Sequence, residues 1–238
     1  MQLRYSIVLG VLLSVLIGLI AQMGLAQDQS SPQSQSQEPS SVLFENVRIF
    51  DGTSEQLSTA SNVLVVGNKI QTISTALIPV PEGNVTRING GGKVLMPGLI
   101  DAHTHLFMET TPAEQLLSPD TDIEVAFQTA KANATEMLMR GFTSTRDMAG
   151  PVFELKKAID QGNGIGPRIW PSGAMISPTA GHGDFRFLEE IPRTASSPLS
   201  RAEQYGVGVI ADGVDEVLRR TREQLMQGAS QIKLAAGG

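Results

Sequence analysis

The sequence contains no cysteine, and this absence excludes several kinds of site. The 238-residue chain can form no disulfide and offers no thiolate zinc ligand, cysteine nucleophile or cysteine for lipid attachment. Any metal must therefore be held by nitrogen and oxygen ligands. Basic residues are also scarce, since 18 Lys and Arg stand against 24 Asp and Glu and leave a net charge of −6. Without a basic field, the chain is not expected to bind nucleic acid.

The N-terminus has the pattern of an export signal over residues 1–26. Arg4 precedes an apolar run at residues 7–20, and small residues at 24–26 form a cleavage site. The apolar stretch is about 20 residues long, so an uncleaved membrane anchor is the alternative. We expect cleavage before Gln27, with no stable membrane insertion afterwards and export to a periplasm or the extracellular space. Residues 27–41 are rich in Gln and Ser and predict a disordered linker.

Residues 42–97 alternate between apolar and polar positions, which is typical of short strands. Gly67 and Asn68 stand between two such runs and predict a hairpin turn. The pattern therefore predicts a small β-rich module. A module of this size is marginally stable alone and is expected to need partners from elsewhere.

Two histidines end an apolar run at residues 94–105 (VLMPGLIDAHTH). In a strand, residues i and i+2 project from the same face, so His103 and His105 would aim two imidazoles at one point while Thr104 faces away. Imidazole is the commonest metal ligand, and the C-terminal ends of parallel strands are where ligand sites collect. The pair therefore indicates a metal site. Two ordinary histidines beside a core strand are the alternative.

After His105 the pattern changes to strands that alternate with helices, which favours βαβ units and a parallel sheet. Four strands are predicted, at residues 99–105, 142–147, 168–176 and 231–234. Helices are predicted from a capping box at Thr121 to Glu124, from Pro151, and from Asp212. Residues 177–211 are interpreted as a long loop over a barrel mouth. A closed (β/α)8 barrel needs about 250 residues, so this region accounts for about half of one.

The order of these motifs resembles the metal-dependent amidohydrolase superfamily, and within it the imidazolonepropionase-like and Xaa-Pro dipeptidase-like group. The resemblance covers residues 42–238. It implies an α/β chain in which residues 98–238 are the N-terminal half of a (β/α)8 TIM barrel, truncated, and residues 42–97 are part of a small β-sandwich domain. The motifs that carry it are 96–105 (MPGLIDAHTH), 141–147 (GFTSTRD), 181–184 (GHGD) and 231–238 (QIKLAAGG).

By this resemblance, His103 and His105 are metal ligands and Lys233 bridges two metals. An ammonium has donors only, so Lys233 must first react with carbon dioxide to form a carbamate, whose two oxygens can span two metals. The expected cofactor is Zn²⁺, as one or two divalent ions, with Lys233 carboxylated in the binuclear case. The alternative is a lysine whose stem packs on apolar neighbours while its amine reaches solvent.

The resemblance also places His182 in a substrate-binding loop, the alternative being an exposed loop histidine. Arg146 and Asp147 are expected to form an internal salt bridge behind the ligands, and Asp101 to orient the histidine strand. The family pattern requires later histidines and a late aspartate, which follow the fourth strand and are absent from this sequence. No catalytic residue is therefore assigned.

The function implied is hydrolysis of C–N amide bonds in a small amide or dipeptide-like substrate by a metal-bound hydroxide. The chain as written is expected to be inactive, and the full-length form is a possible homo-oligomer. One alternative is a non-catalytic truncated remnant. Another is a mononuclear cyclic-amide hydrolase of the imidazolonepropionase type. An exported binding protein is the third, disfavoured because half a barrel leaves sheet edges unpaired.

Overall fold

The computed structural model describes residues 40–80, 85–194 and 196–237. The predicted export signal and most of the predicted linker lie outside these residues. Ser41, assigned to the linker, is instead the first residue of a strand. The described residues divide into two compact units, one within residues 40–48 and 59–93 and the other within residues 49–58 and 94–237. No helix within the described residues is long and apolar enough to cross a membrane.

The first unit is built on one sheet. Its strands β1 (Ser41–Ile49), β2 (Ser61–Val66), β3 (Lys69–Ser74) and β4 (Val85–Asn89) follow the order β3-β2-β1-β4. The short strand β5 (Val94–Leu95) belongs to the second unit. The predicted hairpin is confirmed, because β2 and β3 pair antiparallel across Gly67 and Asn68. The core is Leu43, Leu64 and Ile78. The described strands of this unit belong to one sheet, and part of a β-sandwich is what the sequence predicted for residues 42–97.

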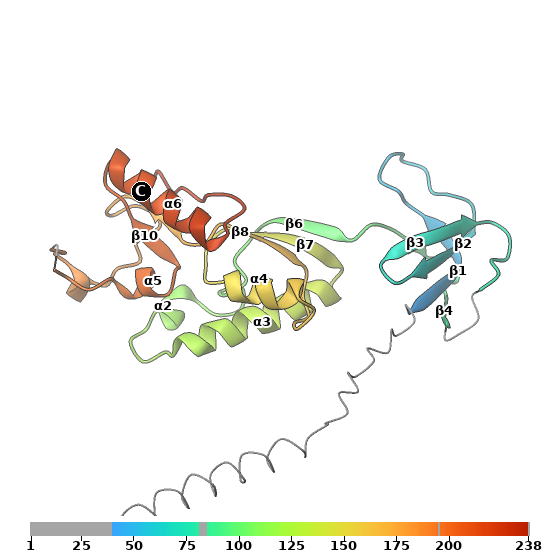
Figure 1. The fold of residues 1–238 in the computed structure, drawn as a ribbon, viewed down its shortest axis with the longest axis horizontal. Coiled ribbons are helices and arrows are strands. Elements are labelled where there is room, and N and C mark those ends of the chain that lie inside the picture. Colours follow the sequence, from blue (N-terminus) through green and yellow to red (C-terminus); the bar gives the residue numbers. More distant parts are fainter. Residues whose placement is uncertain (1–39, 81–84, 195, 238) are drawn as a thin grey trace, which may run out of the picture. The chain divides into compact units, whose positions relative to one another are not determined.

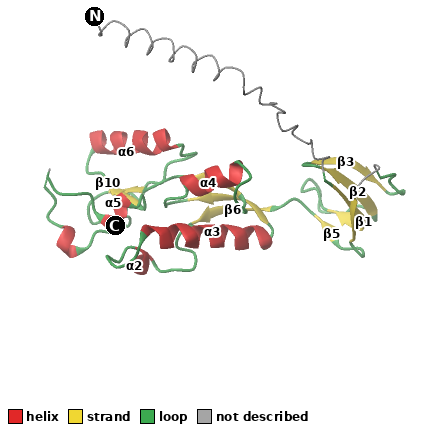
Figure 2. Cartoon of the chain, turned by 60° about the horizontal axis from the view of Figure 1, so that its bottom comes forward, coloured by secondary structure: helices red, strands yellow, loops and turns green. Residues whose placement is uncertain are grey.

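The second unit begins with a parallel sheet of β6 (Leu99–Thr104), β7 (Phe142–Asp147) and β8 (Arg168–Pro171). Helices α3 (Ile123–Met139) and α4 (Phe153–Asp160) lie along this sheet, as Figures 1 and 2 show. The short helix α2 (Ala113–Leu116) precedes α3. Small alanines on α3 (Ala126, Ala130 and Ala134) let the helix approach closely, and they share a core with Leu155 of α4 and Ile169 of β8. This packing positions the carboxyl ends of β6 and β7.

Two predicted helix starts are displaced. Asp122, rather than Thr121, caps α3, because its side chain accepts the Glu124 amide at 3.0 Å. The Thr121 hydroxyl instead donates to the Gln115 carbonyl at 2.7 Å. The second helix begins at Phe153 and not at Pro151.

The predicted third strand is divided into β8 and β9 (Met175–Ser177), which belong to different sheets. Gly173 separates them with a φ of +68°, a conformation that glycine adopts readily. A Cβ there would lie 2.3 Å from Gln224 Oε1, which accepts the Ala174 amide at 2.9 Å. The chain therefore turns at Gly173 instead of continuing one strand.

The predicted loop at 177–211 contains regular structure. The helical turn η1 (Leu188–Glu190) and the helix α5 (Arg201–Gln204) lead to β10 (Gly208–Ile210), which pairs parallel with β9. A capping box between Ser200 and Glu203 starts α5. The interpretation of this segment as one open loop was wrong.

The last helix, α6 (Val214–Gln227), begins two residues after the predicted Asp212 and stops at Gly228, where φ is +102°. The predicted fourth strand is reduced to a single parallel bridge between Ile176 and Leu234. The described strands of this unit therefore form two parallel sheets and do not close into a barrel.

A glycine-to-alanine change at position 98 tests the packing between β6 and β7. A Cβ on Gly98 would lie 2.1 to 2.7 Å from three side-chain atoms of Thr143. We expect Gly98→Ala to lower the free energy of unfolding by about 1–3 kcal/mol, measured by urea denaturation. In a Thr143→Gly background the same change should cost much less. An equal cost in both backgrounds would place the strain elsewhere.

Candidate functional site

The predicted histidine pair lies at the carboxyl end of β6. His103 is the last residue but one of the strand, and His105 is the first residue after it. Their ring centroids are 5.2 Å apart with planes at 64°. The side chain of Asp101 accepts the His103 amide at 3.0 Å, which agrees with its predicted role of orienting this strand. Thr104 between the histidines is buried, so the alternation predicted from strand geometry holds.

His105 interacts electrostatically with three other side chains, those of His103, Lys233 and His182. Burial lowers its pKa, and the neighbouring His103, Lys233 and His182 lower it further. The Ala149 backbone opposes this shift. Even so, the buried Nδ1 atom of His105 has no hydrogen-bond partner within the described residues. A lowered pKa favours the neutral imidazole of His105, which is the form that binds a metal.

The same four side chains are the ones that the sequence assigned to the site. Lys233 and His182 come from segments far from the histidine pair in sequence, yet both interact electrostatically with His105. The amide of Ile176 donates to the Lys233 carbonyl at 3.0 Å, which fixes Lys233 beside β9. His182 is exposed and Lys233 is half-buried. The fold therefore brings His103, His105, His182 and Lys233 to one end of the strands.

The described residues contain no cluster of three His, Asp or Glu side chains able to hold a metal. His103, His105 and His182 therefore do not lie close enough together to form such a cluster. The neutral His105 imidazole and its unpartnered buried nitrogen fit a metal ligand. His103 and His105 could supply two nitrogen ligands to a divalent ion.

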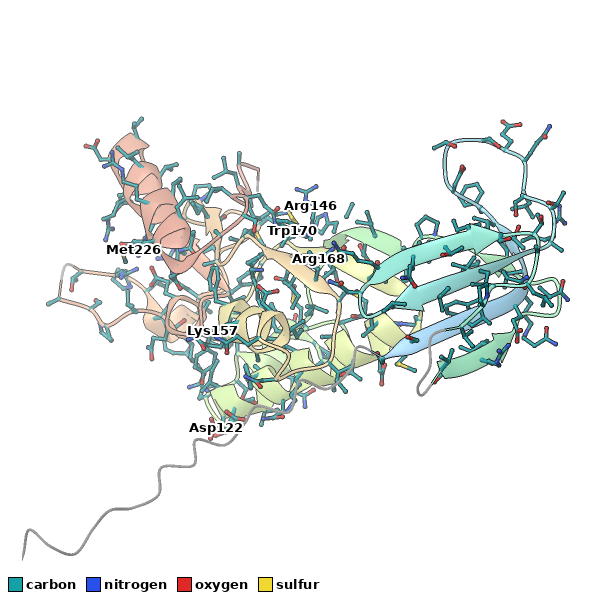
Figure 3. The ribbon with its side chains drawn as sticks, turned by 45° about the vertical axis from the view of Figure 1, so that its right-hand side comes forward. Asp122, Arg146, Lys157, Arg168, Trp170 and Met226 are labelled. Atoms are coloured by element: carbon teal, nitrogen blue, oxygen red, sulfur yellow. The ribbon has the colours of Figure 1, made fainter. Side chains whose placement is uncertain are left out.

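The predicted salt bridge between Arg146 and Asp147 was wrong. Adjacent residues of a strand point to opposite faces, so the two side chains diverge. Arg146 is exposed opposite Trp170 in the β7–β8 register, and Figure 3 shows both on the same side. Asp147 is fully buried and accepts the Leu106 amide at 2.8 Å. It supports the loop that follows the histidine pair.

Burial raises the pKa of Asp147 to about 7, although the backbones of Leu106 and Ala149 act in the opposite direction. Its Oδ1 atom has no hydrogen-bond partner among the described residues. This carboxyl therefore titrates near neutral pH.

Sequence reasoning missed a second group of polar residues around His182. Asp184 forms a buried ion pair with Arg186, and Asp212 accepts two hydrogen bonds from Thr179. Asp184 belongs to the quoted 181–184 motif, and its spacing of two residues from an arginine was the available signal. No sequence pattern relates Asp212 to this loop.

Comparison with known proteins identifies the family of this chain. The family model described as Amidohydrolase family matches residues 94–238. Ochratoxinase from Aspergillus niger is 36% identical over 202 residues, covering 80% of this chain and 41% of that protein.

Two solved structures are similar over most of this chain. An amidohydrolase is 33% identical with a TM-score of 0.70, covering 84% of this chain and 48% of its own. A prolidase complexed with N-methylphosphonate-L-proline is 30% identical with a TM-score of 0.70, covering 84% and 47%. This chain spans less than half the length of these relatives. The predicted fold class is confirmed as an unclosed part of the amidohydrolase fold, and the chain belongs to the amidohydrolase family.

Proposed function

We propose that this chain supplies part of the active site of a metal-dependent hydrolase that cleaves C–N amide bonds in small amide or dipeptide-like substrates. The observation that carries the proposal is the histidine pair at the carboxyl end of β6, with ring centroids 5.2 Å apart and with a buried His105 Nδ1 that has no hydrogen-bond partner among the described residues. Similarity to a prolidase and to ochratoxinase supports an amide substrate. Export of the protein, proposed from residues 1–26, would place this activity outside the cytoplasm.

Each residue has a distinct part in this proposal. His103 and His105 bind a divalent metal as neutral imidazoles projecting from one end of β6. Lys233, as the free amine, takes up carbon dioxide with loss of a proton and becomes an anionic carbamate with two ligand oxygens. When bound, the metal supplies Lewis-acid polarisation of a carbonyl and lowers the pKa of water. His182 contacts the carbonyl or carboxylate of the substrate from its loop.

The three histidines of the chain allow a matched metal-binding experiment. Calorimetric titration of the 238-residue chain with Zn²⁺ should show binding that His103→Ala and His105→Ala each abolish. His182→Ala is the control, because this histidine is proposed to contact substrate and not metal. Retained affinity in both of the first two variants would contradict the proposed ligands.

Metal stoichiometry separates the binuclear proposal from the mononuclear cyclic-amide alternative. The full-length product of the gene should contain two metals per chain if Lys233 bridges them, and one in the alternative. Hydrolysis of dipeptides by that product tests the substrate class directly. Metal binding without any hydrolysis of amides would favour the non-catalytic remnant.

A further inference from the structure

The loop that carries His182 follows β9 and is held at its start by a carboxylate from a distant segment. Asp212 lies just before α6, 33 residues beyond Thr179. Its Oδ1 accepts the Thr179 amide at 2.8 Å and its Oδ2 accepts the Thr179 hydroxyl at 2.5 Å. The two bonds fix both the backbone and the side chain of Thr179.

A second carboxylate holds the other side of the same loop. Asp184 accepts the Ala180 amide at 2.8 Å and two guanidinium bonds from Arg186, at 2.7 and 2.6 Å. The side chains of this ion pair are only 9% and 11% exposed. Arg186 also donates to the Thr179 hydroxyl at 3.3 Å, which joins the two carboxylates into one network. We call Thr179, Asp184, Arg186 and Asp212 the loop clamp.

The segment from Gly181 to Gly183, within the loop clamp, packs closely against β9. A Cβ on Gly181 would lie 2.5 Å from Ser177 Oγ, and one on Gly183 would lie 2.9 Å from Met175 Sδ. The Gly183 amide donates to Ser177 Oγ at 3.0 Å, and the His182 amide donates to the Gly237 carbonyl at 3.2 Å. The backbone at His182 is therefore fixed on two sides while its side chain remains exposed.

We propose that Asp184, Arg186 and Asp212 are positioning residues that hold the His182 backbone at the end of β9, so that its imidazole faces the histidine pair. Two features of the loop clamp point to this role. Its bonds converge on residues 179–186, at whose centre His182 lies, and bidentate pairing with a carboxylate fixes orientation as well as distance. The inference rests on the proposed contact of His182 with substrate. It adds to the proposed function the residues that position His182 for that contact.

Amide hydrogen exchange on the 238-residue chain tests the geometry without any catalytic assay. Asp212→Ala should speed exchange at the His182 and Gly183 amides at least about tenfold, because local opening no longer breaks two charge-assisted bonds. Asp212 is exposed, so this variant is expected to fold. Asp215→Ala, which removes an acidic residue from the first turn of α6, is the matched control and should leave these amides unchanged.

Kinetics on the full-length gene product test the positioning role. Asp212→Ala and Arg186→Ala should each raise KM for a dipeptide at least about tenfold while metal content stays the same. Arg186→Lys, which keeps one charged donor, should recover part of the loss. A merely structural role would instead lower the amount of folded enzyme and leave KM unchanged.

Three results would overturn the inference. Unchanged exchange at His182 in Asp212→Ala would show that the loop clamp does not hold the loop. Faster exchange with an unchanged KM would show that its order has no bearing on substrate binding. An unchanged KM in His182→Ala would remove the proposed substrate contact itself. The exchange experiment does not depend on that contact, so this failure can be told apart from a failure of the loop clamp.

Discussion

Replacing Lys233 by alanine is expected to reduce amide hydrolysis by the full-length gene product by several orders of magnitude. In the proposed site the carbamate of Lys233 is the anionic bridge, and the two imidazoles of His103 and His105 remain to hold one ion weakly. Metal content should therefore fall below two ions per chain. Elemental analysis of the purified variant and its rate on a dipeptide measure both effects.

Chemical rescue makes this prediction specific to the bridging group. A small carboxylic acid at high concentration has the same two-oxygen geometry and should restore part of the activity of Lys233→Ala. Lys233→Arg is the control that should resist rescue, because the guanidinium fills the space, stays positive and has no lone pair to donate. Full metal occupancy and a near-normal rate in Lys233→Ala would contradict the binuclear proposal and favour a single-metal site.

The parts of this site that could be predicted from sequence are those set by local geometry. The i, i+2 spacing of His103 and His105 at a strand end required only the two-residue repeat of a strand. The hairpin at Gly67 and Asn68 required only turn chemistry. Lys233 and His182 could be assigned only through the family resemblance, because no local pattern relates residues from segments so far apart in the sequence.

Each sequence prediction that failed has an identifiable physical cause. The division of the segment 168–176 depends on Gly173, whose left-handed backbone is stabilised by Gln224 from α6. The strand β10 has three residues, too few for a periodic pattern to reveal. The supposed ion pair of Arg146 with Asp147 relied on neighbouring opposite charges, although adjacent strand residues face apart. A tertiary contact decided the first case, whereas short length and local strand geometry decided the other two.

The last prediction concerns Asp147 and the pH dependence of stability. Burial raises its folded-state pKa from 3.8 to about 7, so between these values the folded chain keeps a proton that the unfolded chain has lost. Stability from this group is fully present below pH 3.8 and is lost as the pH rises to about 7. The difference corresponds to about 4 kcal/mol in the free energy of unfolding.

Asparagine at this position cannot ionise, so Asp147→Asn should remove this dependence. Its amide oxygen can still accept the Leu106 amide, but its NH₂ group would occupy the place of Oδ1, which has no partner within the described residues. At pH 4 the wild type keeps most of this stability, so we expect the metal-free variant to be the less stable of the two there, because its unsatisfied donor costs about 1–3 kcal/mol. At pH 8 it should be the more stable of the two.

Urea denaturation of both chains across pH 4–8 measures this crossing. Asp160→Asn is the matched control, because it removes a carboxylate from the partly exposed Lys156 pair on α4, and such pairs contribute little. Its stability curve should run parallel to that of the wild type, whereas the Asp147→Asn curve should diverge progressively up to about pH 7. Parallel curves for both variants would mean that Asp147 is ionised throughout this range. Its support of the Leu106 loop would then be that of an ordinary carboxylate acceptor, present at every pH at which the chain folds.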